Sequence, residues 1–134
     1  MTDKSLAEVE EYLQALSRVR GSVQRCHPEV GRLSDLLHLY RSRALEKEGT
    51  ICEGLRYKFH GPGCLFTDVD GAEVDVDFFE GRLEVFDSWR IRRFSASVQN
   101  EPPRSLEEIT EVCRSLVSQG RLVEPRSGWF SVAP

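Results

Sequence analysis

The sequence lacks any apolar run long enough to cross a bilayer. A membrane-spanning helix needs about 18 or more consecutive apolar residues, and the longest uncharged apolar runs of this chain are far shorter. The N-terminal stretch MTDKSLAEVEE is charged where a secretory signal is apolar. We therefore expect a cytoplasmic protein with no membrane partner.

Closely spaced cysteine pairs are also missing. Four cysteines are present, widely spread and without a C-x-x-C pair: Cys26, Cys52, Cys64 and Cys113. Zinc sites and redox motifs use close pairs, and without a secretory signal disulfides are not expected. We expect buried free thiols, no metal site and no cofactor.

The sequence also lacks an excess of basic residues. The chain has 18 Lys and Arg against 22 Asp and Glu, a net charge of -4 and a pI near 5.4. Nucleic-acid affinity depends on basic surfaces, so this balance argues against general binding to phosphate backbones. It is compatible with a basic protein partner.

The N-terminal part has the apolar spacing of two amphipathic helices. Apolar residues recur every three or four positions over residues 5–25 and again over residues 33–44. Pro28 and Gly31 separate the two runs, and Gly49 is placed to close the second helix. The pattern predicts a helical hairpin.

From Cys52 onward the apolar period changes to two, which predicts an antiparallel β-meander. Its turns are expected at Gly61–Gly63, at Asp70–Gly71 and at Glu80–Gly81. Asp70–Gly71 is a strong hairpin signal because both residue types tolerate the positive φ values of a type I′ turn.

Local signals predict two helices and a β-hairpin after the meander. The first helix follows Asp87, whose side chain is able to accept free amide hydrogens, and ends before Pro102–Pro103. The second follows the capping box Ser105–Glu108 and stops at Gly120. Residues 121–132 predict the terminal hairpin.

These elements predict a single α+β domain over residues 1–134, which is long enough to bury a core. Residues 1–49 form the helical hairpin, and residues 50–134 form the sheet with its helices. The expected order is N-terminal helical hairpin, central antiparallel β-meander, short helix, capped C-terminal helix and terminal β-hairpin.

An acidic row runs along the meander. Between residues 68 and 87 eight carboxylates stand against a single base, Arg82. The members of this acidic row are Asp68, Asp70, Glu73, Asp75, Asp77, Glu80, Glu84 and Asp87. In residues 72–78 strand alternation places Glu73, Asp75 and Asp77 on one face, with successive carboxylates about 6.5 to 7 Å apart.

Three interpretations of the acidic row stay open. A solvated face is favoured, with cross-strand bases such as Arg82, Arg56 or Lys58 as partners. A docking surface for a basic partner comes second. Metal or acid–base chemistry comes third. The carboxylate spacing suits an inverting glycosidase, but nothing in the sequence shows the concave site that such an enzyme needs in order to give its two carboxyl groups different pKa values.

His60 and Cys64 bracket the Gly-Pro-Gly turn beside this row. Together with Asp75 or Asp77 they are candidates for a hydrolytic or metal cluster, which defines the alternative function of a small hydrolase. No paired zinc-ligand spacing supports it. We expect His60 to hydrogen-bond the turn or a strand carboxylate, and Cys64 to fill the core.

The helix after the row carries Trp89 and three arginines. Basic residues beside an aromatic are typical of single-strand nucleic-acid binding. We instead expect the neighbouring carboxylates to take up these guanidinium groups, with Arg90 or Arg93 reaching Asp75 or Asp77.

The capped helix and terminal hairpin have the outline of half a winged-helix domain. A DNA reader of that kind places a helix N-terminus in the major groove. Here the helix carries Glu107, Glu108 and Glu111, which repel phosphate. A nucleic-acid regulator is therefore a second alternative, behind protein interaction.

Four segments resemble a family of short bacterial proteins catalogued as a domain of unknown function. They are YKFHGPGC from Tyr57, VDVDFF at Val74–Phe79, FDSWRIRRF at Phe86–Phe94 and LVSQGRLVE at Leu116–Glu124. The resemblance covers roughly the last two thirds of the chain. Such proteins are often encoded beside polymorphic toxins, so the resemblance implies an immunity protein that binds and neutralises a cognate toxin domain.

No catalytic residue comes with this resemblance, and we expect no enzyme. An inhibitor of this kind needs a rigid scaffold, a charged face and a few aromatic anchors. The candidate partner-binding residues are Asp68, Asp70, Glu73, Asp75 and Asp77, with Trp89 and Trp129 as anchors. The expected partner is a toxin with a basic surface.

Overall fold

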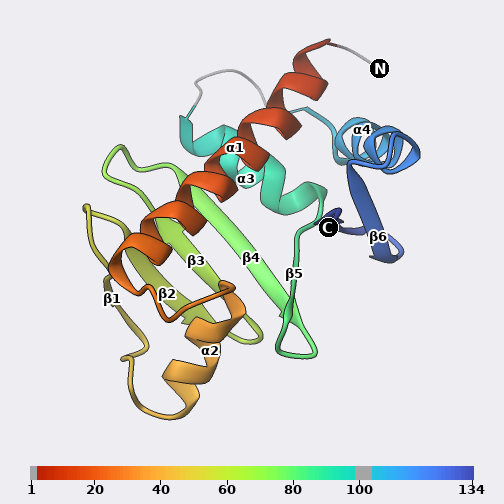
Figure 1. Cartoon of the computed structure of the whole chain (residues 1–134). Helices are drawn as coiled ribbons and strands as arrows, with labels where there is room; N and C mark the ends of the chain where they lie inside the picture. The colour runs from red at the N-terminus through yellow and green to blue at the C-terminus, as the bar shows by residue number, and fades with distance from the viewer. Residues whose placement is uncertain (1–2, 99–103) are drawn as a thin grey trace.

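The computed structural model describes residues 3–98 and 104–134. Its elements are α1 (Asp3–Cys26), α2 (Ser34–Arg41), β1 (Glu48–Thr50), β2 (Arg56–His60), β3 (Gly63–Thr67), β4 (Glu73–Phe79), β5 (Leu83–Val85), α3 (Ser88–Val98), α4 (Leu106–Ser118), β6 (Leu122–Arg126) and β7 (Trp129–Val132). The α+β class and the predicted order of elements are confirmed (Figure 1). None of the described helices is long and apolar enough to cross a bilayer.

The meander is a five-stranded antiparallel sheet with the strand order β1-β2-β3-β4-β5. Its first strand was not predicted, and Gly49 lies in it opposite Tyr57 instead of closing a helix. Helix α2 ends earlier because Arg43 takes a left-handed φ of 66°. The chain then extends and pairs with β2, so the sheet begins at Glu48.

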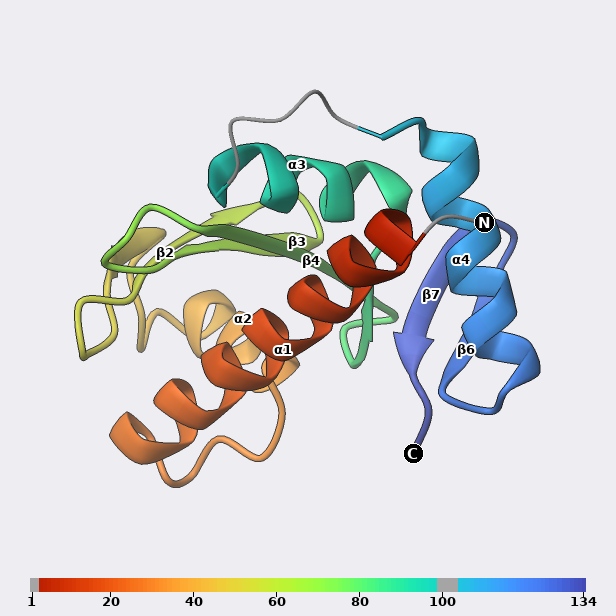
Figure 2. The ribbon, with the colours of Figure 1, turned by 90° about the horizontal axis from the view of Figure 1, so that it is seen from above.

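Helices cover both faces of the sheet (Figure 2): α1 and α2 lie on one face and α3 on the other. Alternation explains the first face, where Tyr57, Phe66 and Val74 stand opposite one another in register and are buried. Tyr40 of α2 stacks on Phe59 of β2 with the ring centroids 4.6 Å apart. Apolar alternation thus gives α1 and α2 a surface to pack on.

Tyr12 of α1 joins the sheet to the helices near the centre of the core. Its ring is fully buried and lies 4.9 Å from the ring of Phe86. The Tyr12 hydroxyl donates to the backbone carbonyl of Asp75 at 2.6 Å. Burial raises the pKa of this phenol well above its usual value, so the hydroxyl stays a donor at neutral pH.

Within the described part of the chain, the C-terminal hairpin β6–β7 is joined to the edge of the sheet by a single β-bridge. Phe86, next to β5, and Phe130 of β7 exchange two backbone hydrogen bonds of 2.9 and 2.8 Å. Helix α4 packs against α1, α3 and β6 at the same end of the molecule. The hairpin therefore stands beside β5 without forming a longer ladder with it.

The predicted helix caps are present, with one difference. Asp87 accepts the amide of Arg90 at 3.0 Å, and the Ser105 hydroxyl accepts the amide of Glu108 at 3.1 Å. Gly120 ends α4 with a φ of 77°. The Glu108 carboxylate accepts from the Ser5 hydroxyl of α1, so it ties two helices together. The predicted Pro102–Pro103 break lies outside the described residues.

The turn at Asp70–Gly71 differs from the predicted type I′ hairpin. Only Gly71 has a positive φ, of 87°, and the connection runs from residue 68 to residue 72. The Asp68 carboxylate accepts the amides of Asp70 and Ala72 at 2.9 and 3.0 Å. A side chain thus organises a longer loop than the dipeptide signal predicts.

The prediction of free cysteines is wrong for two of the four. Cys26 and Cys52 form a disulfide between the end of α1 and the loop after β1, with their Cα atoms 6.2 Å apart. Sequence spacing does not reveal this proximity because the two cysteines are 26 positions apart. Cys64 and Cys113 are free and buried. Burial raises the pKa of both thiols, that of Cys113 to about 12, so neither is a nucleophile at neutral pH.

Candidate functional site

Two residues of the acidic row, Asp75 and Asp77, lie inside the protein. Their exposed fractions are 4% and 8%, because α3 covers the face of β4 on which they stand. The prediction that they belong to an exposed partner-binding face is therefore wrong. Alternation places them on one face of the strand, as the sequence indicates, but it does not show that a helix covers that face.

The buried carboxylates belong to a charge network that holds α3 against the sheet. Arg90 binds Asp77 at 3.1 Å and Asp87 at 3.0 Å, and Arg93 binds Glu73 at 2.8 Å. Both guanidinium groups also face Asp75, at 4.0 Å from Arg90 and 3.5 Å from Arg93. Including the histidine described next, the charge network consists of His60, Glu73, Asp75, Asp77, Asp87, Arg90 and Arg93.

Arg90 is the most enclosed base of the charge network, with 16% of its side chain exposed. Burial lowers the pKa of its guanidinium, whereas Asp87, Asp77 and Asp75 raise it, and the net direction is upward. Arg90 therefore stays charged. Its positive charge compensates the carboxylates that α3 would otherwise bury without partners.

His60 adds an imidazole to the edge of this network. Its Nε2 lies 2.5 Å from Asp75 Oδ1, and 38% of the side chain is exposed. Ligand atoms of His60, Asp75 and Asp77 lie within 4.8 Å of one another, a distance that suits a cation. Arg90 and Arg93 already bind these carboxylates, and their charge opposes a metal ion in the same place.

Gly63 gives the charge network its space. A Cβ atom at this position, in β3, would collide with Asp77 Oδ1 and with the backbone oxygen of Val76. Gly61 has a different role, because its φ of 45° serves the turn and nothing lies near it. Of the two glycines, only Gly63 is required by a neighbouring side chain.

The rest of the acidic row divides between structural and exposed positions. Asp68 organises the β3–β4 loop, and Glu84 is paired with Arg20 at 3.1 Å. Asp70 and Glu80 are exposed, and Glu80 meets Arg82 only at 4.0 Å. The accessible negative charge of the row is thus much smaller than its sequence suggests.

The two tryptophans have different surroundings. Trp89 is 55% exposed on α3. Trp129 is half-buried, with its ring 5.3 Å from the ring of Phe79 and 4.7 Å from the guanidinium carbon of Arg90. Only Trp89 therefore presents most of its surface to a partner, while Trp129 packs between the hairpin and the charge network.

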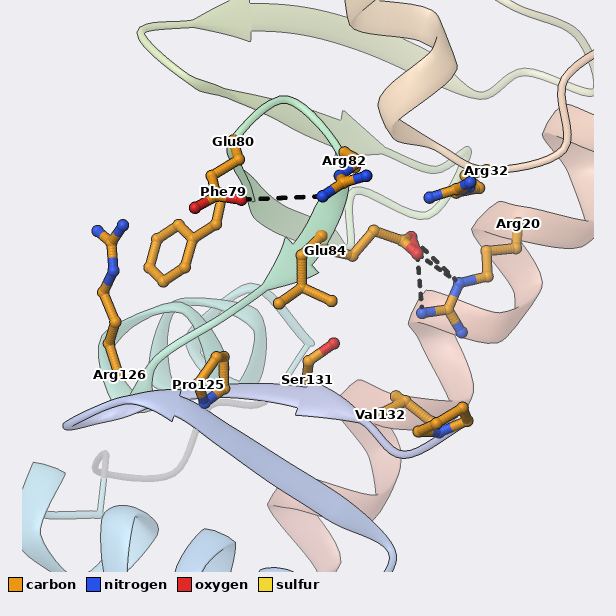
Figure 3. Close-up of a pocket in the computed structure, with 12 residues that line it drawn as sticks. Arg20, Arg32, Phe79, Glu80, Arg82, Glu84, Pro125, Arg126, Ser131 and Val132 are labelled. Carbon is orange, nitrogen blue, oxygen red and sulfur yellow. Dashed lines mark hydrogen bonds and ion pairs between the residues drawn. The ribbon is translucent and has the colours of Figure 1, made fainter.

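One opening among the described residues is a groove of about 700 Å³ that we call the arginine groove (Figure 3). Four guanidinium groups line it, from Arg20, Arg32, Arg82 and Arg126. Its apolar surface comes from Phe79, Leu83, Pro125, Val132 and Pro134, and the side-chain carboxylates of Glu80 and Glu84 also line it. It contains no histidine and no cysteine.

The arginine groove is assembled from four separate parts of the chain. Arg20 belongs to α1, Arg32 to the loop before α2, Arg82 to the β4–β5 turn and Arg126 to β6. No local motif joins these residues, so sequence reasoning missed the site. The only sequence signal was that Arg82 stood alone within the acidic row.

Charges in the arginine groove are only partly neutralised. Glu84 accepts two hydrogen bonds from Arg20 Nε, both of 3.1 Å. Arg126 lies over the ring of Phe79 at 4.2 Å. Arg32 has no ion pair within residues 3–98 and 104–134, and Arg82 has only its distant contact with Glu80. Three guanidinium groups thus remain available to an anionic ligand.

These features define an α+β protein with an internally compensated acidic sheet and an open arginine-lined groove. The family model described as Domain of unknown function (DUF6896) matches residues 6–131, and the chain belongs to this family. The expected relationship to an uncharacterised family is thereby confirmed. The comparisons with curated proteins and with solved structures found no match.

Proposed function

We propose that this protein is a non-catalytic protein-binding module. One observation carries the proposal: the side chains that resembled acid–base machinery, His60, Asp75 and Asp77, are engaged in the charge network. Among the described residues, neither a histidine nor a cysteine lines the arginine groove. Its mixture of apolar surface and charged rim is typical of a contact surface.

The more specific form of the proposal is a bacterial immunity protein that neutralises a toxin domain in the cytoplasm. The resemblance of the segments around Tyr57 and Phe86 supports it. A continuous core from α1 to β7 and the charge network supply the rigid scaffold that a tight inhibitor needs. Asp68, Asp70, Glu73 and Trp89 remain candidate contacts, whereas Asp75 and Asp77 act only by holding α3 in place.

Co-expression with the products of neighbouring genes tests the binding function. We expect one product to co-elute with this protein in a stoichiometric complex on size exclusion, and its toxicity to be relieved. An Asp75→Asn variant changes a buried position and leaves the exposed surface intact, and it is expected to co-elute as the wild type does under conditions in which it stays folded. If no neighbouring product co-elutes and no toxicity is relieved, the immunity function is rejected.

The cytoplasmic location has its own test. Disulfides are rare in reducing compartments, yet Cys26 and Cys52 are joined in the structure. Rapid alkylation of thiols in intact cells, followed by mass spectrometry, reports their state. Free Cys26 and Cys52 agree with the cytoplasm, and a disulfide formed in cells argues for an oxidising compartment.

A second candidate function rests on the half-exposed imidazole of His60 beside the buried carboxylate of Asp75. That pair has the orientation of a general base and the group that positions it. A hydrolase of this kind predicts that His60→Gln abolishes turnover of ester or glycoside substrates without changing the melting temperature. No turnover by the wild-type protein on such substrates rejects it.

The nucleic-acid alternative receives less support from the C-terminal half. The bases of the nucleic-acid hypothesis are Arg121 and Arg126. Arg121 is paired with Glu10, and the neighbouring Arg114 is paired with Glu124, so two bases of these elements have internal partners. Binding of phosphate by these arginines would require their ion pairs to be broken, whereas binding of a protein partner by the same helix and hairpin does not. Failure to shift any DNA duplex at low salt rejects the nucleic-acid function.

A further inference from the structure

We propose that the arginine groove binds an extended acidic segment of the partner protein, which adds as a strand between β5 and β7. This inference rests on the proposed protein-binding function and names the chemistry of the partner. It replaces the expected basic partner surface by an acidic one at this site. Three features of the groove carry it: open strand edges, free guanidinium groups and an apolar surface.

The strand edges come first. Along a strand of an antiparallel sheet, the backbone N–H and C=O groups of successive residues face alternately toward the neighbouring strand on one side and on the other. Phe86 and Phe130 hydrogen-bond to each other between β5 and β7. The next residues whose backbone groups face the space between these two strands are therefore Glu84 and Val132. Phe78 of β4 lies opposite Glu84, and its amide donates to the carbonyl of Pro62, on the side of β4 that faces away from β5. The pair Phe78–Glu84 thus fits this alternation.

No backbone hydrogen bond joins Glu84 to Val132 in the described part of the chain. The two strands therefore separate after the Phe86–Phe130 bridge, and Figure 3 shows Glu84 and Val132 on opposite walls of the groove. Unpaired strand edges are templates for an added strand. A polypeptide is the ligand whose alternating donors and acceptors match them.

The side chains of the groove select the sequence of that polypeptide. Side chains of a strand point alternately to its two faces. Phe79, Leu83 and Val132 offer an apolar surface for one set of side chains. The guanidinium groups of Arg32, Arg82 and Arg126 are available for carboxylates of the other set. A segment with alternating apolar and acidic residues fits both.

A nucleic acid matches the groove less well. Single-strand binding uses exposed aromatic rings on which bases stack. Among the described residues that line the groove, Phe79 is the only aromatic one, and the guanidinium of Arg126 covers its ring. Glu80 and Glu84 also stand where a continuous phosphate backbone would pass. The groove thus favours separate carboxylates over a polyanion.

The test uses an acetylated and amidated octapeptide of alternating Glu and Val as the probe. It is titrated into the ¹⁵N-labelled full-length protein at low salt, and amide shifts are followed. We expect saturable shifts at Glu84 and Val132. Affinity is expected to fall as salt is added, because exposed charges are screened.

Charge-reversal variants locate the binding. We expect Arg82→Glu with Arg126→Glu to weaken binding by about tenfold or more, because two attractions become repulsions. Arg32→Glu, in an exposed loop, is a second variant that serves if the double variant fails to fold. Arg18→Glu, an exposed arginine of α1 outside the groove, is the matched control and is expected to bind as the wild type does.

Two further peptides test the mode of binding. A Lys and Val octapeptide is expected not to bind, and a Glu and Val octapeptide with N-methylated valines is expected to lose binding because its main chain no longer donates. Absence of shifts with the acidic peptide, equal binding by the charge-reversal variants, or tighter binding of a single-stranded oligonucleotide at the same residues overturns the inference.

Failure of this inference is distinguishable from failure of the proposed function. If a partner co-elutes equally well with the wild type and with Arg82→Glu/Arg126→Glu, binding in the arginine groove is rejected and the protein-binding function is kept. A groove that binds the acidic peptide while no neighbouring product co-elutes contradicts the immunity function and retains the groove.

Discussion

Asp75 is the residue on which the charge network converges. Its carboxylate lies next to His60, Arg90 and Arg93, and its backbone carbonyl accepts the hydroxyl of Tyr12. A residue with so many partners and an exposed fraction of 4% is a structural position. Its negative charge compensates the guanidinium groups of Arg90 and Arg93, so the carboxylate is already engaged within the protein.

Removal of that charge has a measurable consequence. Asp75→Asn leaves Arg90 and Arg93 short of one compensating charge, and we expect the free energy of unfolding to fall by about 3 kcal/mol. Urea denaturation measures it. Asp70→Asn, at an exposed position of the same row, is expected to change stability by less than about 0.5 kcal/mol. Equal stability of the two variants contradicts the role assigned to Asp75.

Glu53 is a second residue with a defined electrostatic role. Hydrogen bonds from Arg25 and Ser22 lower the pKa of its carboxyl from 4.5 to about 2. A folded pKa below the unfolded one gives stability that is present above pH 4.5 and is lost as the pH falls toward 2.

The melting temperature between pH 5 and pH 2 tests this linkage. We expect it to fall less steeply in Glu53→Gln than in the wild type, because the variant has no carboxylate there to protonate. Glu46→Gln is the control, since it removes an exposed carboxylate without an ion pair among the described residues. Parallel pH profiles for wild type and Glu53→Gln contradict the assignment.

At the scale of elements, α3 and the sheet are held together by charge, and a glycine of β3 leaves room for one of the carboxylates involved. Asp87 begins the helix, and Arg90 and Arg93 then bring its inner face to β4. Gly63 allows β3 to lie against the Asp77 carboxylate. The position of α3 therefore depends on a glycine in a neighbouring strand.

Gly63→Ala tests this dependence. The added Cβ atom meets the Asp77 carboxylate and the backbone of Val76, and we expect a loss of about 2 kcal/mol in the free energy of unfolding. Gly31→Ala is the matched control because its Cβ atom would make only ordinary contacts. Chemical denaturation of both variants decides the matter, and a Gly63→Ala variant as stable as Gly31→Ala refutes the close approach.

Elements with strong local signals could be predicted from the sequence. The apolar period gave α1, and the caps at Asp87 and Ser105 gave the starts of α3 and α4. Strand β1 could not be predicted, because three residues show no period and the strand exists only through pairing with β2. The hydrogen bond from Ser5 to Glu108 could not be predicted either, because it is a tertiary contact between residues 103 positions apart.

At the scale of the whole molecule, the net charge of -4 does not describe the surface that a partner meets. Much of the acidic row is compensated by α3 and α1, whereas three guanidinium groups of the arginine groove stay available. Sequence patterns find charges that are close along the chain. They do not find the groove, which depends on how four distant segments meet.

Carboxyl footprinting tests most directly the central claim that Asp75 and Asp77, at the centre of the acidic row, are buried under α3 and not exposed to a partner. The native protein is treated with a carbodiimide and glycine ethyl ester, and the labelled carboxylates are found by mass spectrometry. We predict rapid labelling of Asp70 and Glu80, and protection of Asp75 and Asp77 until the protein unfolds. Labelling of Asp75 and Asp77 as fast as that of Asp70 would contradict the account.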